Sequence, residues 1–146
     1  MKKYCKDIDI LDINLISRAT YKGLDDKYAR RDTLNLLSEE TGLTPNNIYY
    51  IYKKFGKMYL FPMVELLILT IQKELINRDL YFIPIWYREK VDPSSFKVRR
   101  IGIQNIKQQI YDYIAVEGLE PFLKTIGEHQ YSSIKGKGCI KGVRQI

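Results

Sequence analysis

Apolar residues recur along the chain at two different spacings, and the spacing changes near residue 80. Between residues 62 and 77 they recur at intervals of three and four, which predicts a helix that begins at Pro62. Leu66 and Leu69 widen its apolar face, so we expect this helix to be buried on most sides.

Residues 81–91 instead alternate, with aromatic and β-branched side chains recurring at every second position, which predicts a strand. The alternation resumes over residues 97–103, and Asp92-Pro93-Ser94-Ser95 between the two segments has the composition of a turn. The two segments therefore predict a β-hairpin. Pro84 has no backbone N–H to donate, so it marks an edge strand or a bulge.

Two helices joined by a short turn are predicted over residues 31–55. Gly42 fits the left-handed position that ends a helix. Thr44 followed by Pro45 fits the N-cap and the first position of the next helix.

Residues 36–55 also have the spacing of a helix-turn-helix motif. In such a motif Leu37 and Ile48 would pack the two helices together. The second helix would face the major groove of DNA with Asn46, Asn47, Tyr49 and Lys53. All-helical cores contain the same kind of helix pair, so a structural αα-hairpin stays open as the alternative.

The remaining helices have weaker patterns. A short helix is expected near residues 11–16, followed by a turn at residues 22–26. After the hairpin a helix begins at Asn105, and Glu120-Pro121 begins another. The predicted fold class is therefore α+β and mainly helical, with a helical N-terminal part, a hairpin over residues 81–91 and 97–103, and then further helices.

The composition narrows the class of protein. The chain has 146 residues, of which 45% are hydrophobic and 28% charged, as in a single globular domain. Cys5 and Cys139 offer neither a disulfide framework nor a metal spacing, and His129 is the single histidine, so we expect no metal site and a cytoplasmic setting. No apolar run reaches the length of a membrane span, and residues 1–7 are not typical of a signal peptide.

The formal net charge of +7 is unevenly distributed. Residues 87–146 carry 11 basic and 6 acidic side chains, whereas residues 1–86 carry 13 and 11. A small protein with one strongly basic half commonly binds phosphate groups. A solvated surface rich in lysine, however, has the same composition.

Basic residues cluster in and beside the hairpin: Arg88, Lys90, Lys97, Arg99 and Arg100. Lys97 and Arg99 are two positions apart and should share one face, which suits a triphosphate or a nucleic-acid backbone. If they bind phosphate, both should be exposed and unpaired, although Glu89 and Asp92 are near in sequence. An edge hairpin that its charges protect from aggregation is the alternative.

Short motifs occur after residue 62 in a fixed order. Glu74–Tyr81 resembles E-L-x-N-G-x-Y, residues 97–103 resemble K-x-R-P-L-G-I, residues 105–110 resemble T-x-x-D-R-I ahead of Leu119-Glu120-Pro121, and residues 132–138 resemble S-Y-G-x-R-P-G-R-S. Through these motifs, residues 62–146 resemble the N-terminal fingers region of bacterial reverse transcriptases, the enzymes of group II introns, retrons and diversity-generating retroelements. The chain departs from the pattern at Phe96, which replaces a turn glycine, at Arg100, which replaces proline, and at Gln108-Gln109, which replaces Asp-Arg.

The resemblance implies a partial fingers subdomain of a right-hand polymerase over residues 61–146, preceded by a helical extension over residues 1–60. The chain would be an N-terminal fragment of an RNA-directed DNA polymerase that binds an RNA template, a DNA primer and a deoxynucleoside triphosphate. The implied site residues are Lys97, Arg99 and Arg100 for the nucleotide phosphates, and Lys135, Gly136, Lys137 and Gly138 for the template backbone.

Polymerisation needs paired carboxylates that hold two metal ions about 3.5–4 Å apart, and in this family they lie downstream of the fingers. The one Asp-Asp pair of this chain, Asp25-Asp26, precedes the hairpin. We therefore expect no catalytic residue and no polymerase activity from the chain alone, with Mg²⁺ as a cofactor of a longer enzyme. An inactive structural remnant is the remaining alternative.

Overall fold

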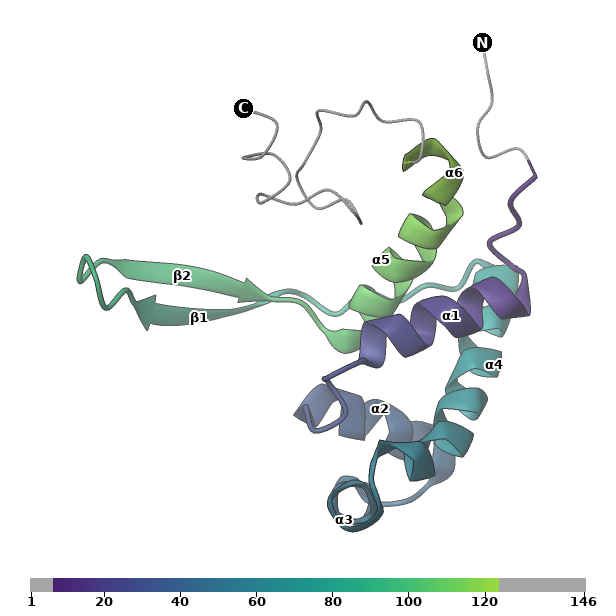
Figure 1. Ribbon diagram of the computed structural model, residues 1–146, viewed down its shortest axis with the longest axis horizontal. Helices are drawn as coiled ribbons and strands as arrows, with labels where there is room; N and C mark the ends of the chain where they lie inside the picture. Colours follow the sequence, from purple (N-terminus) through teal and green to yellow (C-terminus); the bar gives the residue numbers. More distant parts are fainter. Residues whose placement is uncertain (1–6, 124–146) are drawn as a thin grey trace, which may run out of the picture.

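The computed structural model describes residues 7–123, which form helices and one two-stranded antiparallel sheet (Figure 1). The elements in chain order are α1 (Ile13–Leu24), α2 (Arg31–Thr41), α3 (Pro45–Phe55), the short 3₁₀ helix η1 (Lys57–Leu60), α4 (Phe61–Asn77), β1 (Trp86–Val91), β2 (Val98–Ile103), α5 (Ile106–Gly118) and α6 (Glu120–Leu123). The α+β, mainly helical class is confirmed. Within residues 7–123 no helix is long and apolar enough to cross a membrane.

The helices form a body around one hydrophobic core. α1 packs against α4 and α5, and α2 packs against α3, α4 and α5. Fully buried side chains of this core include Ile16, Leu37, Leu67, Ile71 and Ile110, and each stabilises the fold by about 1.5–3 kcal/mol. Residues on both sides of residue 60 contribute to this core. The division at that position into a helical extension and a fingers region stays a prediction.

The connection between α2 and α3 follows the sequence prediction. Gly42 has a φ of 76°, which glycine adopts without a steric penalty. Thr44 Oγ1 accepts a hydrogen bond from Asn47 N at 3.2 Å, and Pro45 is the first residue of α3. Ile48 is the fully buried residue of that helix, so the predicted helix pair is confirmed.

Two helices differ from their predictions. α1 includes Gly23, which packs against Ile110 of α5, and ends at Leu24, so the turn expected at residues 22–26 begins only at Asp25. Leu66 and Leu69 of α4 are 47% and 57% exposed. The prediction that α4 is buried on most sides is wrong, since the helices packed on it, chiefly α1 and α2, leave one side open.

The first strand is shorter than predicted. It begins at Trp86, whose partner across the sheet is Ile103. The second strand ends there because Asn105 caps α5, where its side chain accepts a hydrogen bond from a backbone N–H at 3.0 Å. Residues 81–85 therefore have no partner strand, and Pro84 has no N–H to offer one.

Candidate functional site

The hairpin projects from the helical body as an arm (Figure 1). Every residue of β1 and β2 is exposed apart from Ile103, which is half-buried. A two-stranded hairpin is marginally stable by itself in water. The arm therefore stays folded through the contacts between its two strands and through its attachment to the helical body.

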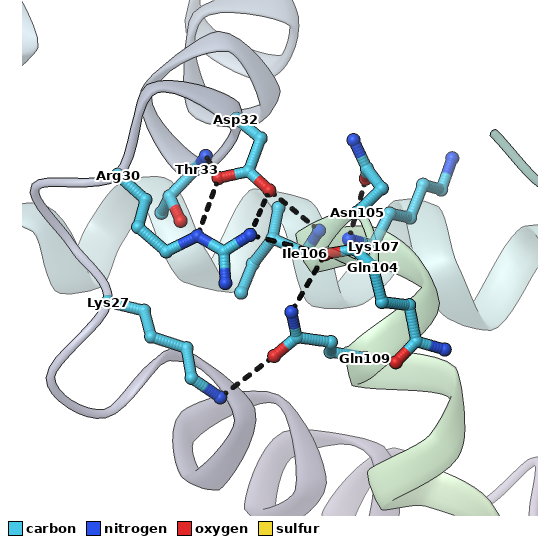
Figure 2. Close-up of polar contacts among 9 residues, drawn as sticks. All are labelled: Lys27, Arg30, Asp32, Thr33, Gln104, Asn105, Ile106, Lys107 and Gln109. Carbon is cyan, nitrogen blue, oxygen red and sulfur yellow. Dashed lines mark hydrogen bonds and ion pairs between the residues drawn. The ribbon is translucent and has the colours of Figure 1, made fainter. Parts of the chain in front are cut away.

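Asp32, at the start of α2, provides the anchor (Figure 2). Its Oδ2 accepts hydrogen bonds from Ile106 N at 2.9 Å and from Arg30 Nη2 at 2.7 Å. Arg30 Nη2 also donates to the carbonyl of Gln104 at 3.2 Å, and Gln109 Nε2 donates to the same carbonyl at 2.9 Å. The carboxylate of Asp32 and the guanidinium of Arg30 thus connect the start of α2 to the start of α5, at the point where the chain leaves the arm.

A pocket of about 580 Å³ lies at the base of the arm. Its walls are the start of α2, the segment before β1 and the start of α5, together with the cross-strand pair Trp86 and Ile103. Arg31 and Asn35 line it from α2, and both are exposed. An indole beside a guanidinium and a carboxamide can hold a flat heteroaromatic ring next to an anionic group.

The strand register divides the arm into two faces. The Trp86 face carries Trp86, Arg88, Lys90, Arg99, Ile101 and Ile103, and the Tyr87 face carries Tyr87, Glu89, Val91, Val98, Arg100 and Gly102. On the Tyr87 face Glu89 lies opposite Arg100, whose guanidinium carbon is 4.0 Å from the centroid of the Tyr87 ring. The charges of the Tyr87 face are therefore balanced within the arm.

The charges of the Trp86 face are not balanced. Lys90 is the direct cross-strand partner of Arg99, and like charges in that position destabilise a sheet. Asp92 relieves part of the repulsion, because its Oδ2 lies 3.1 Å from Arg99 Nη2. Hydrogen bonds from Ser94 lower the pKa of the Asp92 carboxyl. Among residues 7–123 no carboxylate forms an ion pair with Arg88 or Lys90.

The structure separates the residues predicted to bind nucleotide phosphates. Asp92 N donates to the carbonyl of Lys97 at 2.8 Å, so the strand alternation continues into the turn and places Lys97 beside Arg99. Arg100 lies on the other face. The expectation that both Lys97 and Arg99 are unpaired is wrong for Arg99, which pairs with Asp92. The remaining predicted residues, Lys135, Gly136, Lys137 and Gly138, lie outside the described residues.

Sequence reasoning missed the pocket residues Arg31, Asn35 and Trp86 as members of one site. Arg31 and Asn35 belong to a helix that the sequence placed in a separate region, and no short motif contains them. A weak signal was available at Trp86, because an aromatic residue within a basic strand is a feature of surfaces that bind single-stranded nucleic acid.

Polymerisation requires carboxylates that hold metal ions, and the surroundings of the carboxylates in residues 7–123 bear on that requirement. No three side chains of metal-ligating type gather within residues 7–123. Asp25 of the Asp25-Asp26 pair lies 3.6 Å from Lys57 Nζ. Asp25 therefore belongs to an ion pair between the end of α1 and η1.

Comparisons of the chain with models of protein families, with curated proteins and with solved structures give no match.

Proposed function

We propose that this chain is the fingers region of an RNA-directed DNA polymerase, and that the Trp86 face of its arm binds the phosphates of the template and of the incoming nucleotide. The observation that carries the proposal is the unbalanced charge of this face. Its cations are Arg88, Lys90, Lys97 and Arg99, and its carboxylate is Asp92. A polyanion on this face supplies the missing negative charge and screens the repulsion between Lys90 and Arg99.

The pocket at the base of the arm supports the same function. Trp86 and Ile103 belong both to the Trp86 face and to the lining of the pocket, so a strand bound along the cations leads toward the indole. Base–aromatic stacking is worth about 1–3 kcal/mol per base and adds to the electrostatic attraction. Arg31, which also lines the pocket, provides a further cation for the adjoining phosphate.

Fluorescence anisotropy with a labelled primer–template, carrying a single-stranded overhang, tests this proposal over a range of salt concentrations. Arg88→Gln removes a cation from the Trp86 face, and Arg100→Gln is the matched control on the Tyr87 face. Arg88→Gln should reduce the slope of log K against log salt by roughly 0.7 to 0.9, whereas Arg100→Gln should leave it unchanged. Equal losses, or binding that does not respond to salt, would indicate that the cations only protect an edge hairpin.

A helix-turn-helix DNA-binding protein is the second candidate, and the α2–α3 pair favours it. The turn at Gly42 and the buried pair Leu37 and Ile48 suit the motif, and the outer face of α3 exposes Asn46, Asn47, Tyr49 and Lys53. This candidate predicts tighter binding to duplex DNA than to the primer–template. It also predicts a loss of binding in Asn47→Ala and none in Arg88→Gln.

A further inference from the structure

We propose that a second surface, on α3 and η1 of the body, binds single-stranded RNA. This tyrosine–lysine patch consists of Tyr49, Tyr50, Lys53, Lys54, Phe55 and Tyr59. α3 lies below α2 in Figure 1, while α5 and the arm lie above it. The patch therefore shares no residue with the arm, and the inference does not rest on the function proposed for the arm.

The rings of the patch face solvent. Ile48 is the fully buried residue of α3, and the opposite side of the helix is open to water. Tyr50, Phe55 and Tyr59 are 57%, 50% and 60% exposed, and the centroids of the Phe55 and Tyr59 rings are 5.1 Å apart. A contiguous group of exposed rings on a folded domain marks an interaction surface.

Two lysines lie over these rings. Lys54 Nζ is 5.3 Å from the centroid of the Tyr50 ring and 5.6 Å from that of Phe55, and it donates a hydrogen bond to Tyr50 Oη at 2.9 Å. Lys53 Nζ is 5.6 Å from the centroid of the Tyr49 ring. A cation thus lies beside the rings of Tyr49, Tyr50 and Phe55, as binding of a base together with its phosphate requires.

The surrounding charge favours a polyanion. Residues 41–64 contain Lys53, Lys54 and Lys57 but no acidic residue. Lys57 is paired with Asp25 at 3.6 Å, at the edge of the patch. In the part of the chain that the structure describes, no carboxylate forms an ion pair with Lys53 or Lys54.

The chemistry of the patch selects single-stranded RNA among polyanions. Bases stack on exposed rings only when they are not already paired and stacked in a duplex. The tyrosine hydroxyls, together with Asn46 and Asn47 at the start of α3, can donate to and accept from a ribose 2′-hydroxyl. Both asparagines are exposed.

The test uses the full chain and fluorescence anisotropy with a short, unstructured, labelled RNA, alongside DNA of the same sequence and duplex DNA. Tyr50→Leu removes a stacking ring from a position that is already exposed, so the fold should be retained, and a thermal melt verifies this. We expect Tyr50→Leu to raise the Kd for the RNA roughly five-fold or more. Tyr50→Phe keeps the ring and should change the Kd less than two-fold. Lys54→Gln should weaken binding and also reduce its dependence on salt.

Equal or tighter binding of the DNA strand, or a preference for duplex DNA, would overturn the inference. So would a wild-type Kd for RNA in both Tyr50→Leu and Lys54→Gln. Arg88→Gln in the arm separates this inference from the proposed function. If Arg88→Gln alone weakens binding, the patch is excluded and the arm is supported. If only the patch variants weaken RNA binding, the result supports the patch and does not support the function proposed for the arm.

Discussion

The helical body and the arm use charged residues in different ways. In the body, Glu117 is 9% exposed and pairs with Lys22 and with Arg18, whose Nε lies 3.7 Å from Glu117 Oε2. Glu74 pairs with Lys107 at 2.6 Å and accepts a hydrogen bond from Tyr111. A buried carboxylate without partners would be costly, so the charges of the body are matched where they are buried.

The arm leaves cations unmatched and apolar rings exposed. Lys90 faces Arg99, and Trp86 is 63% exposed. At the tip Phe96 is 82% exposed and has a φ of 55°, a conformation that costs a residue with a Cβ about 1–2 kcal/mol. The buried charges of the body are therefore matched within the fold, whereas the arm places like charges opposite each other and holds Phe96 at a positive φ that lowers its stability.

The largest effect on stability is expected in the body. Leu67→Ala removes a fully buried side chain of α4 and should lower the free energy of unfolding by about 2–5 kcal/mol. Trp86→Ala, the control on the arm, should lower it by less than about 1 kcal/mol because the indole is mostly exposed. Urea denaturation followed by circular dichroism measures both. Similar losses would contradict the distinction between body and arm.

The anchor between the two regions should give an intermediate effect. Asp32→Ala removes the carboxylate that accepts from Arg30 and from Ile106 N, and should destabilise the protein by about 1–3 kcal/mol. Asp112→Ala removes an exposed carboxylate that accepts a hydrogen bond from Gln104 Nε2 at 2.7 Å. This substitution should lower the free energy of unfolding by about 0.5 kcal/mol or less. The same denaturation experiment ranks the two, and a reversed ranking would show that Asp32 is not the anchor.

A smaller effect is expected at the tip of the arm. Phe96→Gly should stabilise the hairpin by about 1 kcal/mol, because glycine adopts the positive φ without a steric penalty. Phe96→Ala keeps the Cβ and should give no gain, which separates backbone strain from loss of the ring. Amide hydrogen exchange of the two strands is the measurement. Slower exchange in Phe96→Ala than in Phe96→Gly would be inconsistent with strain at this residue.

The smallest effect at neutral pH is expected for Tyr28→Phe in the body. Burial raises the pKa of Tyr28 to about 12, whereas tyrosine in an unfolded chain has a pKa of about 10. The unfolded state therefore loses its proton first, and stability should fall as the pH rises from about 10 to about 12. Tyr28→Phe should have little effect at pH 7 and should reduce this loss. Urea midpoints at pH 7 and pH 11 test this, and an undiminished loss in Tyr28→Phe would contradict it.

Local features of the fold could be predicted from the sequence. The end of α2 at Gly42, the start of α3 at Pro45 and the cap of α5 at Asn105 each depend on residues only a few positions apart. The hairpin also follows from alternation and a turn. The same alternation places Arg100 on the opposite face from Arg99, so the sequence contained the information that divides the predicted phosphate site.

Other features depended on segments that are distant in the chain. The start of β1 at Trp86 was decided by where its partner strand ends, and the exposure of Leu66 by how much of α4 the neighbouring helices cover. The pocket combines Arg31 with Trp86, and the anchor combines Asp32 with Ile106. Hydrophobic periodicity and helix capping depend on residues within one or two helical turns of each other. They therefore give no information about the distance between segments that are far apart in the sequence. Packing of the core sets those distances. Most helices, the hairpin and their charges could therefore be predicted from the sequence, whereas packing brought Arg31 to Trp86 and Asp32 to Ile106.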